Sequence, residues 1–430
     1  MILRDPVHGL VSFESEEDAI VVELLKTREL QRLRHIRQLG LTSLVYPGAD
    51  HTRFSHAVGA AFVMTRFVER LRKEHDSLPY WQRLTSERAR EGIAAALLHD
   101  VGHGPFSHLF EEALPDGPLH ETWTERIILD PSTEVHQVLR RADPKLPERV
   151  SELIHGRHPL TYLARTVSGT FDVDRCDYLL RDAHATGVSY GHFDLDWLVR
   201  SLRLGVSEDP DQAPPLAIDG TRGLPAIESF ILARLFMFQQ VYFHKASRAS
   251  EWMLRGIMGR VRELLTDGTP VPGLPRGIEE LALRGDTSLG EYLQLDDPRL
   301  WTALSAWQSA KDPLLSDLAQ RLYRRRLFKT VDLFGEHASP SGQAAALLLA
   351  EEAAARVGLR PATYVGLDVA ELTPFDGLDT SLSVLLPDGS AQAPVEVSFL
   401  LRRLAGQTLQ QVRLIVAPEI RDEVRRALGA

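Results

Sequence analysis

The sequence contains a single cysteine, Cys176, among 430 residues. An intrachain disulfide is therefore impossible, and a zinc site built from several thiolates is excluded. So little cysteine is typical of proteins in a reducing compartment, and we expect this protein in the cytoplasm. Any metal site must instead use histidine, aspartate or glutamate, of which the chain has 16 His and 59 Asp plus Glu.

Long apolar runs and an excess of basic residues are also missing. The apolar runs at 94–98 and 344–350 are too short to span a bilayer, and residues 1–6 lack the apolar core of a signal peptide. Lys and Arg total 49 against 59 acidic residues, a formal net charge of −10. The short apolar runs lead us to expect no membrane association. A general nucleic-acid binder needs a basic surface, so we also expect no strong nucleic-acid binding. A small anionic substrate stays compatible with this charge, because a local pocket of cationic side chains can still be positive.

Helical spacing of apolar residues dominates the chain as far as residue 360. It predicts helices over residues 19–25, 57–71, 92–98, 171–182, 197–202 and 226–261. Thr85 or Ser86 is a suitable N-cap ahead of the helix that ends at Leu98. The Pro- and Gly-rich stretch 205–225 predicts a loop with a short hairpin near 216–218.

The pattern changes beyond about Pro361. Residues 363–369, 382–386, 395–399 and 412–416 have the composition of short strands, and 419–428 that of a helix. We therefore predict a mostly α protein with a small C-terminal α+β appendage. Its expected segments are a catalytic helical core at 1–205, a helical extension completing the pocket at 206–335, and the α+β region at 336–430.

A histidine–aspartate pair, His99-Asp100, follows one expected helix and precedes Gly102. A helix that breaks at glycine can aim two neighbouring side chains into one cavity, and imidazole and carboxylate groups suit a borderline divalent metal. His56 begins another helix with an apolar inner face, and Asp174 lies on a third. Taken alone, the pair also fits a capped helix end, and the helix of Asp174 fits a solvated acidic face.

The order His56, His99-Asp100, Asp174 resembles the H…HD…D motif of the HD phosphohydrolase superfamily. Longer matches resemble its deoxynucleoside triphosphate triphosphohydrolases and extend over roughly residues 1–330. They are RDPVHG (4–9), QRLR (31–34), QLG (38–40), YPGA (46–49), RFSH (53–56), HDVGHGPFSH (99–108), DVD (172–174), DY (177–178) and YFHK (242–245).

The resemblance implies an HD-domain helical core and one divalent transition metal on His56, His99, Asp100 and Asp174. Two imidazoles and two carboxylates leave open positions on a six-coordinate ion, which is what a catalytic site requires. This mixed donor set suits Fe, Mn, Zn, Co or Ni without choosing among them, and Mg²⁺ is expected on a triphosphate substrate. The implied reaction is hydrolysis of a dNTP at the α-phosphate, releasing deoxynucleoside and inorganic triphosphate.

Further roles are carried over by the same resemblance. Histidine titrates near neutrality, so the implied acid–base group is His103, His108, Glu111 and His120, with His108 or His120 protonating the leaving 5′ oxygen. The implied substrate-binding residues are Gln38, Arg53, Arg175, Tyr178, Asp182, Arg234 and Tyr242. In a continuous helix Arg234, Phe238 and Tyr242 would share one face. Each of these residues also has a structural reading, as a surface charge, a cap or a core aromatic.

Three positions depart from the better-known animal relatives. Phe238 stands where they carry a histidine near the phosphates, and Arg175 replaces a lysine. Lys26 replaces an aspartate that reads guanine at an activating site, although Arg34 is retained. The resemblance implies that the protein forms dimers or tetramers and that a nucleotide activator is a possible partner. Because Lys26 replaces the aspartate, we do not expect activation that is specific for guanine.

Two other functions stay open on the sequence. One is an HD phosphohydrolase acting on nucleoside monophosphates, signalling nucleotides or single-stranded nucleic-acid ends. The other is a nucleotide-binding regulator without turnover, against which the presence of all four expected metal ligands argues.

Overall fold

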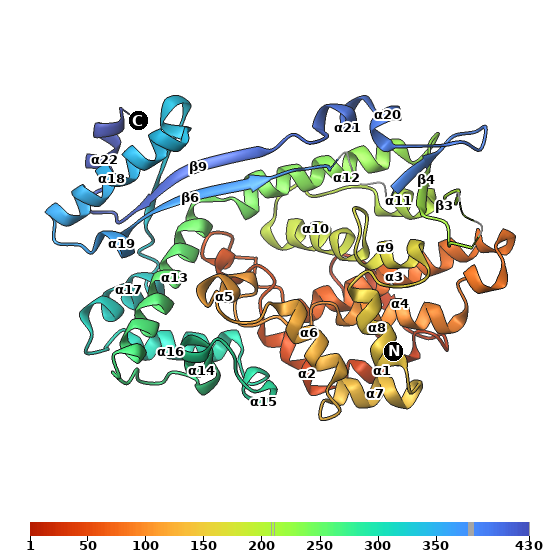
Figure 1. Cartoon of the computed structure of the whole chain (residues 1–430), viewed down its shortest axis with the longest axis horizontal. Helices are drawn as coiled ribbons and strands as arrows, with labels where there is room; N and C mark the ends of the chain where they lie inside the picture. Colours follow the sequence, from red (N-terminus) through yellow and green to blue (C-terminus); the bar gives the residue numbers. More distant parts are fainter. Residues whose placement is uncertain (208, 210, 377–381, 430) are drawn as a thin grey trace.

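The protein is mostly α-helical, as predicted, and in the computed structural model the strands among its described residues form three small sheets (Figure 1). The structure describes residues 1–207, 209, 211–376 and 382–429. The helices of the first half are α1 (Ala19–Leu24), α2 (Arg28–Arg32), α3 (Arg53–Arg72), α4 (Ser86–Leu98), α5 (His108–Ala113), α6 (His120–Leu129), α7 (Glu134–Ala142), α8 (Leu146–Ile154), α9 (Thr161–Val167), α10 (Val173–Thr186) and α11 (Leu195–Ser201).

The second half is also helical but carries most of the strands. Its helices are α12 (Leu224–Met237), α13 (Lys245–Thr266), α14 (Arg276–Arg284), α15 (Leu289–Tyr292), α16 (Asp297–Trp307), α17 (Pro313–Tyr323), α18 (Pro340–Arg356), α19 (Pro361–Tyr364), α20 (Pro394–Val397), α21 (Phe399–Leu404) and α22 (Arg421–Leu428). In the described part of the chain, no helix combines the length and apolarity needed to cross a membrane.

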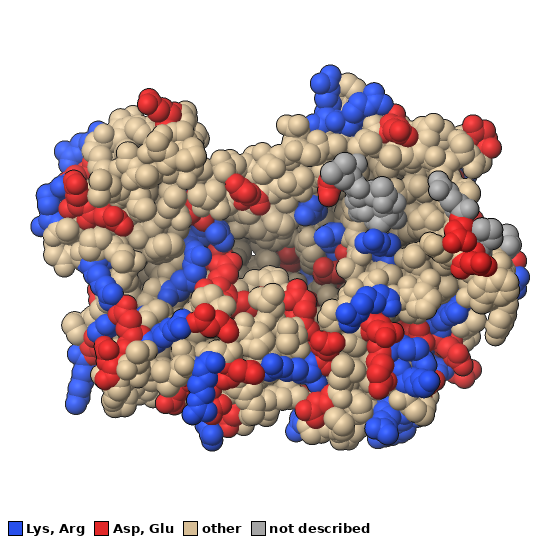
Figure 2. Space-filling model, in the orientation of Figure 1, with Lys and Arg blue, Asp and Glu red and all other residues tan. Residues whose placement is uncertain are grey.

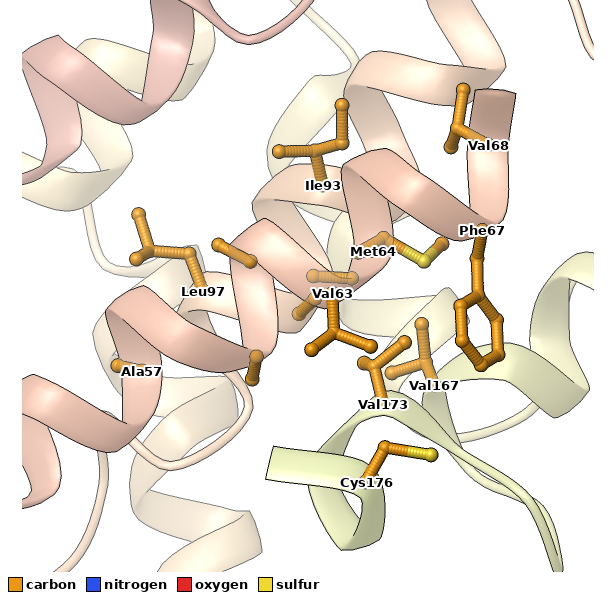
Figure 3. Packing of buried hydrophobic residues seen from close by; sticks show 14 of the residues in the cluster. Ala57, Val63, Met64, Phe67, Val68, Ile93, Leu97, Val167, Val173 and Cys176 are labelled. Carbon is orange, nitrogen blue, oxygen red and sulfur yellow. The ribbon is translucent and has the colours of Figure 1, made fainter. Parts of the chain in front are cut away.

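Helices α3, α4 and α10 pack together around a shared apolar core (Figure 3). Val63 and Phe67 of α3, Leu97 of α4, and Val173 and Cys176 of α10 are all buried in it. Thr85 caps α4 as predicted, because its side-chain oxygen accepts a hydrogen bond from the backbone N–H of Arg88. This packing brings the start of α3, the end of α4 and the first turn of α10 to one place.

The predicted continuous helix over 226–261 is wrong. The segment contains α12, a π-helical turn η5 (Phe238–Tyr242) and α13, separated at His244. The N–H of Phe243 donates to the carbonyl of Phe238, a bond to the fifth residue back rather than the fourth. The extra residue in the turn shifts the side chains that follow it, so regular i, i+4 spacing does not apply to Phe238 and Tyr242.

The strands tie the C-terminal region to the rest of the chain. They are β1 (Ile2–Asp5), β2 (Gly9–Ser12), β3 (Leu202–Leu204), β4 (Leu216–Asp219), β5 (Lys329–Asp332), β6 (Val365–Leu372), β7 (Leu382–Leu385), β8 (Ala391–Gln392) and β9 (Leu409–Val416). The sheet orders are β1-β2, β3-β4-β7-β8 and β5-β9-β6. β4 pairs in parallel with β7, with Leu216 opposite Leu382, and the expected hairpin is β3-β4.

The α+β character of the C-terminal region is confirmed, but its elements differ from the prediction in detail. The predicted strand at 395–399 is instead α20 followed by α21, because Pro394 starts one short helix and the Ser398 side chain caps the next. β5 was not predicted and pairs antiparallel with β9. The division into segments 1–205, 206–335 and 336–430 stays a prediction.

Candidate metal centre and adjoining cavity

Four side chains from three elements meet where α3, α4 and α10 converge. His56 lies in the first turn of α3, His99 and Asp100 directly follow α4, and Asp174 lies in the first turn of α10. The Nε2 atoms of His56 and His99 are 3.3 Å apart, and both face Asp174 Oδ1, at 3.0 and 3.4 Å. Asp100 approaches the same two nitrogens at 3.6 and 3.5 Å. The four residues singled out on the sequence therefore come together.

Hydrogen bonds orient both imidazoles toward this point. Nδ1 of His99 is 2.9 Å from the carbonyl oxygen of Ala96, to which it must donate. Nδ1 of His56 lies 2.8 Å from Asp177 Oδ2, a carboxylate that accepts. In each ring the proton on Nδ1 leaves Nε2 free to bind a cation, the usual arrangement of metal-bound histidine.

A buried charge network holds Asp177 in place. Arg181 donates to both Asp177 oxygens at 2.8 Å and to Asp5 at 2.8 Å, and His8 Nε2 lies 2.6 Å from Asp177 Oδ1. The carboxyl group can approach α3 only because residue 59 is glycine, where an added Cβ would lie 1.9 Å from Asp177 Oδ1. Sequence reasoning gave these residues no role, although two of its matched motifs, RDPVHG and DY, contain Asp5, His8 and Asp177.

The donor set fits a divalent transition metal. Its Nε2 and carboxylate donors converge, and the donor atoms of His56, His99 and Asp174 all lie within 4.8 Å of one another. Burial lowers the pKa of His56, but hydrogen bonds with Asp174 and Asp177 outweigh burial and raise it to about 10. Burial raises the pKa of Asp174, yet His56 and His99 hold it well below its ordinary value. A bound cation would replace the proton that these groups share.

A second cluster adjoins the first and contains the four residues expected to transfer protons. The rings of His103 and His120 stack with centroids 3.8 Å apart, and His108 packs edge-on against both. Glu111 Oε1 accepts from Nδ1 of His120 at 2.9 Å. Burial raises the pKa of Glu111, but hydrogen bonds with His108 and His120 hold it below its ordinary value. Burial, and then Arg53, keep the pKa of His103 well below its ordinary value, so this imidazole is neutral.

The loop between the two clusters has an unusual backbone. Phe106 and Ser107 have φ angles of 56° and 61°, a region that residues with a Cβ rarely adopt. The Asp297 carboxylate accepts from the N–H of Phe106 at 2.8 Å and from that of Arg37 at 3.0 Å. The Tyr292 hydroxyl donates to the carbonyl of Gly102 at 2.6 Å. Residues almost two hundred positions away therefore hold the loop in its conformation.

We expect the free energy of unfolding to decrease as pH rises through the titration of Asp297. Burial raises the pKa of Asp297 to about 6 from an ordinary 3.8, and its hydrogen bonds with Phe106 and Arg37 offset burial only in part. Between these values the folded protein keeps a proton that the unfolded chain has lost, so the contribution is full below pH 4 and is lost by pH 6. Unfolding of the wild type and of Asp297→Asn, followed against pH, should differ by a term that decreases by on the order of 3 kcal/mol over this range. An equal slope in the variant would contradict the assignment.

A cavity of about 670 Å³ opens beside both clusters. Figure 2 shows a hollow in the middle of the viewed face, with acidic and basic side chains at its rim. Among the expected site residues, His56 and Glu111 do not line the cavity. The wall includes His99, Asp100, Asp174, His103, His108, His120, Gln38, Arg53, Arg175, Tyr178, Asp182, Arg234 and Tyr242.

The cationic side chains of the cavity are partly engaged. Arg53 pairs with Asp100 and donates from Nε to Ser107 Oγ at 2.7 Å. Arg175 contacts the carbonyl of Gly169, and Arg234 donates to the carbonyl of Pro374 at 2.7 Å. Arg234 Nε is buried without a hydrogen-bond partner among the described residues. Three arginines therefore line a cavity large enough for a nucleotide.

A hydrogen-bonded group forms another part of the cavity wall. The Tyr242 hydroxyl donates to Asp182 Oδ2 at 2.7 Å, and His51 Nε2 lies 2.7 Å from Asp182 Oδ1. Burial and then Asp182 raise the pKa of Tyr242 well above its ordinary value, so the phenol keeps its proton. Phe238 also lines the cavity, and the Arg234 guanidinium carbon lies over the Phe238 ring, 5.3 Å from the ring centroid. Sequence reasoning missed His51, and also Arg248 and Glu251, which line the cavity as an ion pair.

Comparison with known proteins agrees with this geometry. The family model of the HD domain matches residues 53–182, which hold all four residues of the metal centre. The uncharacterized protein YwfO of Bacillus subtilis is 36% identical over 375 residues, which are 87% of this chain and 81% of that protein. A deoxynucleoside triphosphate triphosphohydrolase, SAMHD1 of Gallus gallus, is 30% identical over 287 residues, 59% of this chain but only 44% of that protein.

A solved structure gives the same result for the fold. The crystal structure of a phosphohydrolase from Bacteroides thetaiotaomicron has a TM-score of 0.79 and 29% sequence identity, covering 97% of this chain and 99% of the other. The metal-site geometry, the HD-domain match and these relatives agree with one another. The chain belongs to the HD-domain phosphohydrolase superfamily.

Proposed function

We propose that the protein is a metal-dependent dNTP triphosphohydrolase, which cleaves its substrate at the α-phosphate into deoxynucleoside and inorganic triphosphate. The observation that carries the proposal is a single cavity lined by metal ligands, by Arg53, Arg175 and Arg234, and by the Tyr242–Asp182 pair. The similarity to SAMHD1 over part of the chain supports the same substrate class.

His56, His99, Asp100 and Asp174 would hold a divalent cation, which would supply Lewis-acid chemistry at the phosphate. The chain's own groups do the rest. The three arginines bind phosphate oxygens through charge-assisted hydrogen bonds. Glu111 accepts from Nδ1 of His120, which leaves Nε2 of that ring as the atom that can exchange a proton with the 5′ oxygen.

Sugar recognition is proposed for other residues of the cavity wall. Tyr178 and Asp182 bracket the sugar, and Gln38 contacts the 3′-hydroxyl. Gln38 Oε1 is buried and has no hydrogen-bond partner among the described residues, as expected of an acceptor that waits for a ligand. The Tyr242 ring is fixed by its hydroxyl bond to Asp182 and would leave no room for a 2′-hydroxyl.

We also propose the three chain segments given above and a homodimer or homotetramer as the working form. Their basis is the sequence pattern and the assembly implied by the resemblance.

Product analysis tests the reaction. The protein, loaded in turn with Fe, Mn, Co, Ni or Zn, is incubated with each dNTP and each rNTP, and the phosphate product is identified by ³¹P NMR. We expect inorganic triphosphate from dNTPs and little turnover of rNTPs. Orthophosphate or pyrophosphate would instead favour an HD phosphohydrolase acting on other nucleotides. Binding without hydrolysis across the whole panel would favour a regulator.

A further inference from the structure

A second cavity, of about 430 Å³, lies between α2 and the segment around α15. These elements are neighbours at the lower edge of the view in Figure 1. Its lining is Arg28, Glu29, Arg32, Ser288, Gly290, Glu291, Leu293 and Gln294, none of which lines the first cavity. Ser288, Gly290 and Gln294 are exposed at the rim, whereas Glu29 and Arg32 are buried. The proposed function does not use this cavity.

Arg32 is a buried cation that contacts no carboxylate among the described residues, and Asp296 and Asp297 act on it only from a distance. Arg32 is only 7% exposed, and its Nε donates a hydrogen bond to the carbonyl of Leu295 at 2.9 Å. Neither Nη1 nor Nη2 has a hydrogen-bond partner, and no carboxylate lies within ion-pair distance among the described residues. The guanidinium lies 5.3 Å from the centroid of the Tyr292 ring. Burying an unpaired charge is costly, so a partner from outside the chain is expected.

Glu29 has one carboxylate oxygen that lacks a hydrogen-bond donor among the described residues. Its side chain is fully buried, and Oε1 accepts from Arg28 Nε at 2.8 Å and from the N–H of Glu134 at 3.2 Å. Oε2 has no hydrogen-bond partner among the described residues. A ligand that completes both groups must therefore present oxygen acceptors to Arg32 and a hydrogen-bond donor to Glu29. A protonated phosphate, or a carboxylate that carries a hydroxyl group, meets both requirements.

We propose that this cavity is an oxyanion-binding site in which Arg32 binds the anionic oxygens and Glu29 accepts from a hydroxyl of the same ligand. Nη1 and Nη2 lie side by side on the planar guanidinium, a geometry that suits two oxygens of one phosphate or carboxylate group. A cavity of this volume holds a small ligand rather than a polymer.

The position of the site connects it to the metal centre. Arg32 holds the carbonyl of Leu295, which lies between Tyr292 and Asp297. Those two residues fix the loop after the HD pair, through Gly102 on one side and Phe106 on the other. Tyr292 also stacks on Trp123 with centroids 3.8 Å apart. An anion bound to Arg32 therefore stabilises the segment that holds loop 102–107. We expect anion binding to reduce the mobility of that loop.

Calorimetric titration with orthophosphate, and separately with malate, tests the site at constant ionic strength. We expect one of them to bind and Arg32→Met to weaken that binding by at least roughly tenfold, since hydrogen bonds to a charged group are lost. Gly290 offers a matched pair that leaves Arg32 intact, because a side chain there meets nothing within 4 Å. Gly290→Glu should weaken binding by repulsion and Gly290→Gln should not.

Arg234→Gln, which alters only the first cavity, serves as the second control: it should weaken any phosphate binding there and leave unchanged the binding that Arg32→Met weakens. The ligand should also slow amide hydrogen exchange in residues 102–107 of the wild type but not of Gly290→Glu. If only phosphate shows these effects, the natural ligand is a phosphate. If only malate shows them, the natural ligand is a hydroxylated carboxylate. Binding that is unaffected by both Arg32→Met and Gly290→Glu, or no binding of either anion, would overturn the proposal.

Discussion

Replacing both His99 and Asp100 with alanine is expected to abolish hydrolysis and leave the protein folded. The change removes two of the four donors that converge on one point, and His99 and Asp100 lie at the cavity wall rather than within the apolar core. A cation contributes several kcal/mol to phosphoryl transfer, so turnover should fall by roughly a thousandfold or more. Activity, metal content by mass spectrometry and the thermal unfolding curve together check this outcome.

The control for this variant is His184→Ala, because His184 is an exposed histidine of α10, away from the metal centre. It should keep both metal and activity. Substantial turnover by the double variant would count against the whole assignment of the centre. A double variant that loses metal and also fails to unfold cooperatively would show that the ion is needed for folding, and Asp100→Asn would then be the variant to assay.

Asp177→Asn is expected to weaken both metal binding and the fold. The Asp177 carboxylate is fully buried and accepts from His56 Nδ1, from two nitrogens of Arg181 and from His8. Asparagine has one acceptor oxygen and would turn an NH₂ group toward these donors. Residues that orient metal ligands typically contribute 10- to 100-fold in affinity, so we expect a loss of about that size. Loss of the negative charge that pairs with the buried Arg181 should lower the free energy of unfolding by roughly 3–5 kcal/mol.

Metal titration and urea unfolding separate the two effects. The matched control is Asp196→Asn, which removes an exposed carboxylate paired with Arg66 and should cost less than about 1 kcal/mol. A variant that is destabilised but binds metal with unchanged affinity would show that Asp177 supports only the packing of α10 on α3. Unchanged stability would contradict the proposed importance of the buried charge network.

Sequence patterns predicted the helical core well because its apolar periodicity is strong. α3 and α10 bury apolar residues at helical spacing, which is visible in the order of residues, whereas α4 is buried on all sides over residues 91–98. The pattern failed where local rules compete with it. Phe238–Tyr242 is apolar and aromatic enough for a regular helix, yet the chain inserts an extra residue there. At 395–399 the apolar residues suit a strand, but Pro394 and the Ser398 cap favour two short helices.

The support of the metal centre illustrates the same limit. The four donors could be picked out because His56, His99-Asp100 and Asp174 follow a family motif. Asp177, Arg181, His8 and Asp5 could not be given roles, because their contact spans 176 positions between Arg181 and Asp5. The buried Arg32 is still less visible in the sequence, where an arginine at this position simply belongs to the QRLR motif.

The order of residues by itself determined which parts of the chain are helical, which residue types can hold a metal, and which chemistry the absence of cysteine pairs excludes. These properties depend on neighbours a few positions apart, so they are readable along the chain. Only the tertiary structure decided which nitrogen of each imidazole is free, which carboxylates are held by arginine, and that the buried Arg32 forms no ion pair with any described residue. Those properties depend on burial and on groups brought together from distant positions, where removal from water makes each unmet charge or hydrogen bond count.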